Sequence, residues 1–186
     1  MGDNVAMTTL EIGPDSGTLT LHTGVEGKAA RMGHALTIGL TDWSATVTHD
    51  GGRPTAVSFR AGLASFAVLE GNGGVKPLSD KDRRTIRDSA LESLSAAKHP
   101  DVTLDGTEVV ARDGGWTVVG TLTVAGAARP VRADVAVTET AGTLALSLAV
   151  PVVQSAHGVK PYSAMMGTLK VADVVEVRLR AEVPTP

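Results

Sequence analysis

Cysteine is absent from the 186 residues of the sequence, and neither sign of charge is in clear excess. Without cysteine there can be no disulfide framework, no thiolate zinc site and no cysteine nucleophile. The 17 basic and 20 acidic residues give a formal net charge of -3, and the basic residues are scattered among acidic ones instead of forming a block. A nucleic-acid partner is therefore not expected.

Long hydrophobic runs are also missing. The most apolar stretch, Leu144 to Val153, is broken by Ser147 and Pro151 and reaches only about half the length of a membrane-spanning helix. The first thirty residues carry four acidic side chains and lack the apolar core of a secretory signal. Together with the absence of cysteine, which fits a reducing compartment, this pattern indicates a cytoplasmic protein that does not span a membrane.

Local motifs for catalysis or metal binding are not found. None of the five histidines forms an HxH, HxxxH or HExxH arrangement, so any metal site would need distant strands to converge. The nucleophile motif GxSxG is absent, and the glycines at 71–74 lead into Val75-Lys76-Pro77 rather than into a P-loop or dinucleotide turn. The sequence therefore predicts no metal site, no required cofactor and no nucleotide binding.

An alternation of apolar and polar residues dominates the rest of the chain. In the clearest case, between Trp116 and Val124, large apolar residues take one face and threonines the other, as in a half-buried strand. The same period of two recurs in seven further segments: 19–21, 36–40, 57–63, 102–104, 135–137, 144–150 and 175–179. Because turn formers such as Asp113-Gly114-Gly115 separate them, the sequence predicts about eight strands, mostly antiparallel.

One segment, about residues 80–97, has a helical pattern instead. Ile86, Ala90 and Leu94 recur at fourfold spacing, and Ser79 is available as the N-cap with Asp82 three residues on. We expect this amphipathic helix to end near Lys98-His99-Pro100, where proline discourages continuation.

The predicted fold is all-β. Eight antiparallel strands with short links tend to close into a barrel, because closure removes unpaired edges, and a barrel of this size can hold one small ligand. A two-sheet sandwich is the alternative. The length favours a single domain, 1–186, whose core we place at about 17–183 between a flexible N-terminal segment and a C-terminal tail at 184–186.

Several residues can be interpreted in two ways. The large apolar side chains would either fill a core or line a cavity, and alternation alone does not separate the two. His34 at a strand start is either satisfied by backbone or a polar contact at a pocket mouth. His99 before Pro100 is more typical of a helix end than of a catalytic base, although it could also close over a barrel rim.

Four phrases of the sequence stand in a distinctive order: Gly33 to Ile38 with Trp43 after it, Lys98 to Leu104 following the helix, Gly120 to Gly126 leading to Arg129-Pro130-Val131, and Gly158 to Ser163 continuing through Met165-Met166-Gly167 to Val177. In this order and spacing the chain resembles the YceI-like family of polyisoprenoid-binding proteins. The resemblance covers nearly the whole chain, from Gly17 to Ala181.

The resemblance implies a lipocalin-like antiparallel barrel with a helix near one end. It also implies a hydrophobic tunnel for an isoprenoid quinone or similar chain, frequent dimerisation and no established catalytic role. Carried over to this sequence, it makes His34 and His99 candidate head-group contacts. The candidate tunnel-lining residues are Leu36, Ile38, Phe59, Phe66, Trp116 and Met165.

Two positions depart from the family pattern. Ala35 stands where many relatives carry aspartate, and His157 stands where an aromatic residue is common, so the chemistry at the head group is expected to differ. The leading hypothesis is a protein that sequesters or carries an isoprenoid or fatty-acyl molecule. The alternatives are an interaction or stress-associated protein whose barrel is filled by side chains, and an enzyme that uses His34 and His99.

Overall fold

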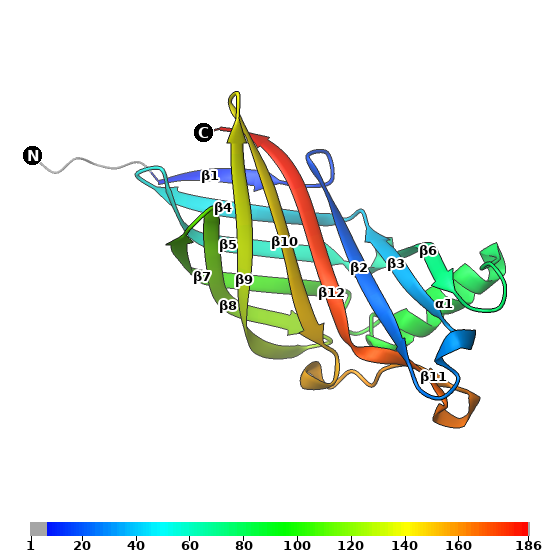
Figure 1. The fold of residues 1–186 in the computed structure, drawn as a ribbon. Helices are drawn as coiled ribbons and strands as arrows, with labels where there is room; N and C mark the ends of the chain where they lie inside the picture. Colours follow the sequence, from blue (N-terminus) through cyan, green and yellow to red (C-terminus); the bar gives the residue numbers. More distant parts are fainter. Residues whose placement is uncertain (1–6, 186) are drawn as a thin grey trace, which may run out of the picture.

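A strongly curled antiparallel sheet forms the body of the molecule (Figure 1), and the computed structural model describes residues 7–185. The sheet has twelve strands. The strands are β1 (Met7–Ile12), β2 (Gly17–Glu26), β3 (His34–Leu40), β4 (Trp43–Asp50), β5 (Arg53–Gly62), β6 (Ala67–Gly73), β7 (Asp101–Arg112), β8 (Gly115–Val124), β9 (Ala127–Thr140), β10 (Thr143–Val153), β11 (Ser163–Ala164) and β12 (Leu169–Pro184). The helix α1 (Asp80–Ser93) lies between β6 and β7 in the chain.

The strand order explains how the sheet curls. The order is β1-β4-β5-β7-β8-β9-β10-β12-β2-β3-β6, with β11 paired to β12. Strands β1, β4 and β5 therefore lie at one end of the sheet, and β2, β3 and β6 lie at the other. The chain passes directly from one end to the other in the links β1–β2, β3–β4 and β5–β6. We call these three links the corners, and they hold the two ends of the curled sheet together.

Polar contacts fix the corners. The Ser65 hydroxyl accepts hydrogen bonds from the backbone N–H groups of Thr41 (3.2 Å) and Asp42 (3.0 Å), which joins the β5–β6 link to the β3–β4 link. Arg60 donates to both carboxylate oxygens of Asp42, at 2.9 and 3.2 Å, and also pairs with Asp101 at 2.8 Å. The hydrogen bond from Arg60 holds the pKa of the Asp42 carboxyl below its usual range.

The predicted all-β, antiparallel architecture with one α-helix is confirmed, but the count of eight strands is wrong. All eight predicted segments are strands, and the structure adds β1, β4, β6 and β11. Strand β4 also has apolar residues that alternate with threonines, and it directly follows the predicted strand at 36–40. The glycines in β6 are typical of a loop, and β11 has only two residues. The hydrogen-bonded path has two ends, so the curled sheet is not the fully paired barrel that eight strands predicted.

The helix begins as predicted and ends four residues early. Ser79 accepts from the N–H of Asp82, whose carboxylate accepts from the N–H of Ser79 in return, which is a complete capping box. At the other end, Ser95 adopts a left-handed conformation with φ 52°, and Ala96 N–H bonds back to the carbonyl of Leu91 at 2.9 Å. These features form a Schellman ending, which stops the helix at Ser93 rather than at residue 97.

The ordered body is longer at both ends than the predicted core of 17–183. Strand β1 pairs with β4, and Ile12 at its end is 5% exposed. The rest of the predicted flexible N-terminal segment, residues 1–6, lies outside the described residues. At the other terminus β12 continues to Pro184, so the predicted tail is shorter than 184–186, and Pro186 again lies outside the description.

The core inside the curled sheet consists of two apolar clusters. The larger gathers Leu19, Ile38, Leu40 and Trp43 with their neighbours, and the smaller centres on Val118. The rings of Trp43 and Phe59 lie 6.5 Å apart at a tilt of 33°. Among residues 7–185, α1 is too short and too polar to cross a membrane, and no other helix there could do so.

Candidate functional site

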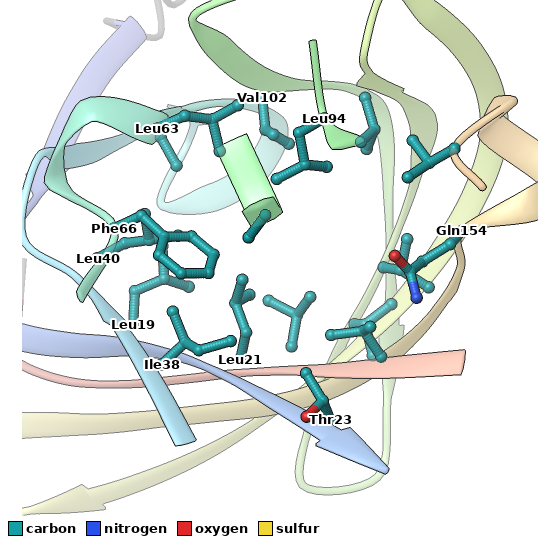
Figure 2. Close-up of a pocket in the computed structure, with 18 of the residues that line it drawn as sticks. Leu19, Leu21, Thr23, Ile38, Leu40, Leu63, Phe66, Leu94, Val102 and Gln154 are labelled. Atoms are coloured by element: carbon teal, nitrogen blue, oxygen red, sulfur yellow. The ribbon is translucent and has the colours of Figure 1, made fainter. Parts of the chain in front are cut away.

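A cavity of about 520 Å³ lies between the two clusters, inside the curl of the sheet (Figure 2). Its wall is made by the inward residues of most strands, because successive side chains of a strand point to opposite faces. Along β8, for example, Val118, Leu122 and Val124 line the cavity. The apolar lining includes Ile12, Leu19, Leu21, Val25, Leu36, Ile38, Leu40, Ala45, Val47, Val57, Phe59, Ala61, Leu63, Phe66, Val131, Ala133, Val135, Leu146, Leu148, Val150, Val177 and Leu179.

The cavity exists because the inward side chains are short. Most are valine, leucine or alanine, and only two phenylalanines, Phe59 and Phe66, reach the lining. The whole sequence has just two phenylalanines, two tryptophans and one tyrosine. With so few large groups, the interior of a sheet curled this widely is not filled, which leaves an apolar space.

Polar side chains in the lining gather at one end, which we call the polar end. They come from the end of β2, the start of β3, the segment between β10 and β12, and the start of β12: Thr23, His34, Gln154, His157, Tyr162 and Lys170. The hydroxyl residues Thr85, Ser89 and Ser93 are spaced along α1 and also line the cavity. Hydrogen bonds tie these elements together. Thr23 accepts from the backbone N–H of Leu36 at 3.1 Å, and the Gln154 side chain donates to the carbonyl of Ala172 at 2.9 Å. The remainder of the cavity is hydrocarbon.

Five of the predicted site residues line this cavity. Leu36, Ile38 and Phe66 are all buried, and Phe59 faces the cavity from β5. His34 stands at the polar end, where its Nε2 bonds to the carbonyl of Lys76 at 2.8 Å. His34 therefore has the backbone partner of one interpretation, while the other, a polar contact at a pocket mouth, stays a prediction.

The structure places the other three outside the lining. Trp116 is half-buried at the start of β8, next to the β7–β8 turn and two residues before the lining begins at Val118. Met165 is 50% exposed at the start of a short 3-10 helix, Met165–Gly167, and has a left-handed φ of 51°. His99 packs its ring on the β8–β9 turn, where a methyl group added to Gly126 would lie 2.5 Å from Cε1 of the imidazole.

His34 and His99 also do not share a site. His34 lies beside the segment that leads into α1, since its Nε2 bonds to the carbonyl of Lys76 at 2.8 Å. His99 lies beyond the other end of the same helix, which at 14 residues is about 21 Å long. Within residues 7–185 no group of three histidine or carboxylate side chains is placed to hold a metal ion. The structure therefore does not support a catalytic site in which His34 and His99 act together.

The fold and cavity can be compared with known proteins. The family model of the YceI-like domain matches residues 15–183, which is nearly the whole chain. The chain belongs to the YceI-like family. No curated protein matches the sequence.

Solved structures show the same YceI-like fold at low sequence identity. BcnA of Burkholderia cenocepacia is 18% identical, with a TM-score of 0.68 over 92% of this chain and 99% of that chain. The YceI protein of Campylobacter jejuni is 16% identical, with a TM-score of 0.60 over 80% of this chain and 84% of that chain. At these identities the similarity establishes the architecture and leaves the ligand open.

Two polar residues of this YceI-like chain were missed as site candidates. His157 is 6% exposed, lines the cavity and makes a 2.9 Å hydrogen bond from Nδ1 to the carbonyl of Ala127. Gln154 precedes it by three residues, and Figure 2 shows its side chain directed into the cavity. The available signal for His157 was its departure from the aromatic residue common in the family. Nothing in the local sequence marks Gln154.

An external carboxylate holds the segment that carries both residues. Asp173 accepts from the backbone N–H of Ser155 at 2.8 Å and from the Ser155 hydroxyl. These hydrogen bonds favour the ionised form, so the pKa of Asp173 lies below its usual range. The turn between Gln154 and His157 is thereby anchored to β12, which fixes both side chains at the polar end.

Proposed function

We propose that this YceI-like protein binds one molecule with a long apolar chain, which it sequesters or carries. The observation that supports this most directly is the cavity, whose walls are hydrocarbon apart from the polar end and three hydroxyl residues of α1. Its volume of about 520 Å³ falls within the range of about 300–1,000 Å³ that is typical of small-molecule sites. Burial of an apolar chain contributes about 25 cal/mol for each Å² removed from water, so a long chain supplies most of the affinity.

The distribution of polar groups supports one orientation for the ligand. An isoprenoid or fatty-acyl chain would lie among Leu19, Ile38, Phe59 and Phe66, where it meets only apolar side chains. Its polar head would then lie near His34 and Gln154 at the polar end. The reverse orientation would bury the head group among carbons without hydrogen-bond partners, which costs about 1–3 kcal/mol on the scale of protein mutational data.

The experiment that tests the proposal is native mass spectrometry of the gently purified protein, followed by organic extraction and identification of any bound molecule. We expect one isoprenoid or acyl chain per protein chain. A ligand-free mass, with no uptake of added quinones or fatty acids, would overturn the proposal. It would instead support a protein that works through its outer surface.

A cavity-filling variant gives a second test. Leu148 lines the cavity, and its neighbour Ala149 on β10 points outward and is exposed. We expect Leu148→Trp to weaken uptake of a long apolar chain, because the indole occupies space that the chain needs, while Ala149→Trp binds like the wild type. Equal binding by both variants would place the ligand elsewhere.

We also propose that the protein works in the cytoplasm as a homodimer, as the sequence composition and the resemblance led us to expect. In the described part of the chain β1 pairs only with β4, and such an exposed strand edge offers a surface for pairing. Light scattering of the purified chain should give twice the mass of the monomer. Fractionation of the source cells should recover the protein with cytoplasmic markers.

A further inference from the structure

The polar end of the cavity has a specific hydrogen-bonding character. A backbone carbonyl can only accept a hydrogen bond, so the side-chain atom paired with it must be the donor. His157 makes such a contact through Nδ1, and Gln154 makes one through Nε2. For each of these side chains the carbonyl therefore determines which of its atoms carries the hydrogen.

For His157 the consequence falls on the second ring nitrogen. With Nδ1 donating to Ala127 at 2.9 Å, Nε2 of the neutral imidazole has a lone pair and no hydrogen. Among residues 7–185 no buried side-chain nitrogen or oxygen lacks a partner, so Nε2, which has none in the protein, opens to free space. Because His157 is 6% exposed and lines the cavity, that space is the cavity.

Gln154 and His34 repeat the pattern. The amide of Gln154 donates through Nε2 to Ala172, which leaves Oε1 as an acceptor on a side chain directed into the cavity (Figure 2). His34 donates through Nε2 to Lys76, which leaves Nδ1 as an acceptor. His157 and Gln154 thus each offer an acceptor atom on a side chain that lines the same end of one apolar space.

We infer that the ligand carries a neutral hydrogen-bond donor at its head, as a long-chain alcohol or phenol does, and that His157 accepts its hydrogen. This inference rests on the proposed function and specifies the head group for the same cavity. A hydroxyl donates and also accepts, and the Thr23 hydroxyl, whose oxygen already accepts from Leu36, still has a hydrogen to give. An ionised carboxylate beside His157 would be desolvated without a donor from the neutral imidazole. Lys170 is exposed, so a carboxylate paired with it would stay at the rim.

The test compares three probes of equal chain length on the full-length protein stripped of bound lipid: dodecanol, dodecyl methyl ether and dodecane. Their affinities are measured by displacement of a neutral fluorescent dye. The ether has an oxygen but no hydrogen to donate. We expect the wild type to bind dodecanol about three- to tenfold more tightly than the ether, which is the contribution of one net hydrogen bond. In His157→Phe, which restores an aromatic side chain, the alcohol and the ether should bind equally.

The control variant is His22→Phe, because His22 lies outside the lining and bonds only to Thr20. It should keep the preference for the alcohol. If the wild type does not distinguish alcohol from ether, or if His157→Phe retains the preference, the inference is wrong while the proposed function stands. Dodecane distinguishes failure of the inference from failure of the proposed function. Binding of dodecane to both variants shows that they are folded. Failure of all three probes to bind any form of the protein would overturn the proposed function itself.

Discussion

At the scale of single residues, glycine decides how closely strands β7 and β8 approach. Gly106 and Gly120 face each other across this pair, next to a register shift in β7. A methyl group added to Gly120 would lie 2.0 Å from the carbonyl oxygen of Asp105 and 2.7 Å from the α-carbon of Gly106. Both are backbone atoms, so neither can move aside without displacing a strand.

We therefore predict that Gly120→Ala destabilises the fold by about 1–3 kcal/mol, the usual cost of forcing an extra carbon into a packed site. Urea unfolding followed by circular dichroism measures the change. Gly13→Ala is the control, because a methyl group there would meet only the carbonyl of Trp43 at 3.6 Å. Its effect should stay within about 0.5 kcal/mol, and an equally small effect for Gly120→Ala would contradict the steric argument.

Alternation in the sequence predicted the direction of side chains better than their surroundings. It placed Ile38 and Phe59 on inward faces, where they now line the cavity. Trp116 has the same period as Val118 yet lies beyond the cavity, because periodicity does not say how far along the strand the space extends. His99 lies in the link between α1 and β7 and Met165 in a short 3-10 helix, where side-chain directions depend on backbone angles that no repeating pattern encodes.

At the scale of elements, the ending of α1 includes a strained residue. Ser95 has φ 52° at the position after the C-cap, where glycine is preferred because a β-carbon is disfavoured in the left-handed conformation. We predict that Ser95→Gly raises the free energy of unfolding by about 1 kcal/mol. Arg84→Gly, at an exposed position inside the helix, should lower it by about the same amount. Thermal unfolding of both variants measures the two changes in stability. A destabilising effect of Ser95→Gly would refute the prediction.

The corner beside Asp42 should make stability depend on pH. Its carboxyl has a lowered pKa because Arg60 donates two hydrogen bonds to it. A group with a lowered pKa stabilises the folded state above its unfolded value of about 3.9, and this contribution is lost as pH falls through the folded value. We predict that Asp42→Asn is less stable than the wild type at pH 7 and that the difference closes below about pH 4. A gap independent of pH, measured by urea midpoints, would exclude the ion pair as its cause.

Elements were predictable where local sequence and tertiary contacts agree. Ser79 and Asp82 formed the expected capping box, since that motif needs only residues three apart. Strand β6 was not predicted, because its last residues, Gly71 to Gly73, have the composition of a loop and form a strand only through pairing with β3. Pairing between distant segments is not encoded locally, which is why the count of strands fell short.

At the scale of the whole molecule, a bound ligand should stabilise the fold by mass action. A ligand present at about 100 times its dissociation constant adds about 2.7 kcal/mol, and for a chain of this length that raises the unfolding temperature by about 5 to 10 °C. We predict such a rise with a saturating long-chain alcohol in differential scanning fluorimetry. Leu148→Trp should respond less than Ala149→Trp, and an identical rise in both would point to binding outside the cavity.

The wall around the cavity is uneven in its mechanical stiffness. Neighbouring strands are joined by a continuous ladder of backbone hydrogen bonds, whereas α1 is attached through side chains to β6 and to the link that precedes it. Arg83 donates to the carbonyls of Val68 and Leu69, and Arg87 donates to those of Phe66 and Ala64. The contacts of Arg83 also cover part of the open edge of β6, since its guanidinium occupies carbonyls of that strand. The helix is therefore the most easily deformed part of the cavity wall. Its amide hydrogens should exchange with solvent before those of β7 to β10.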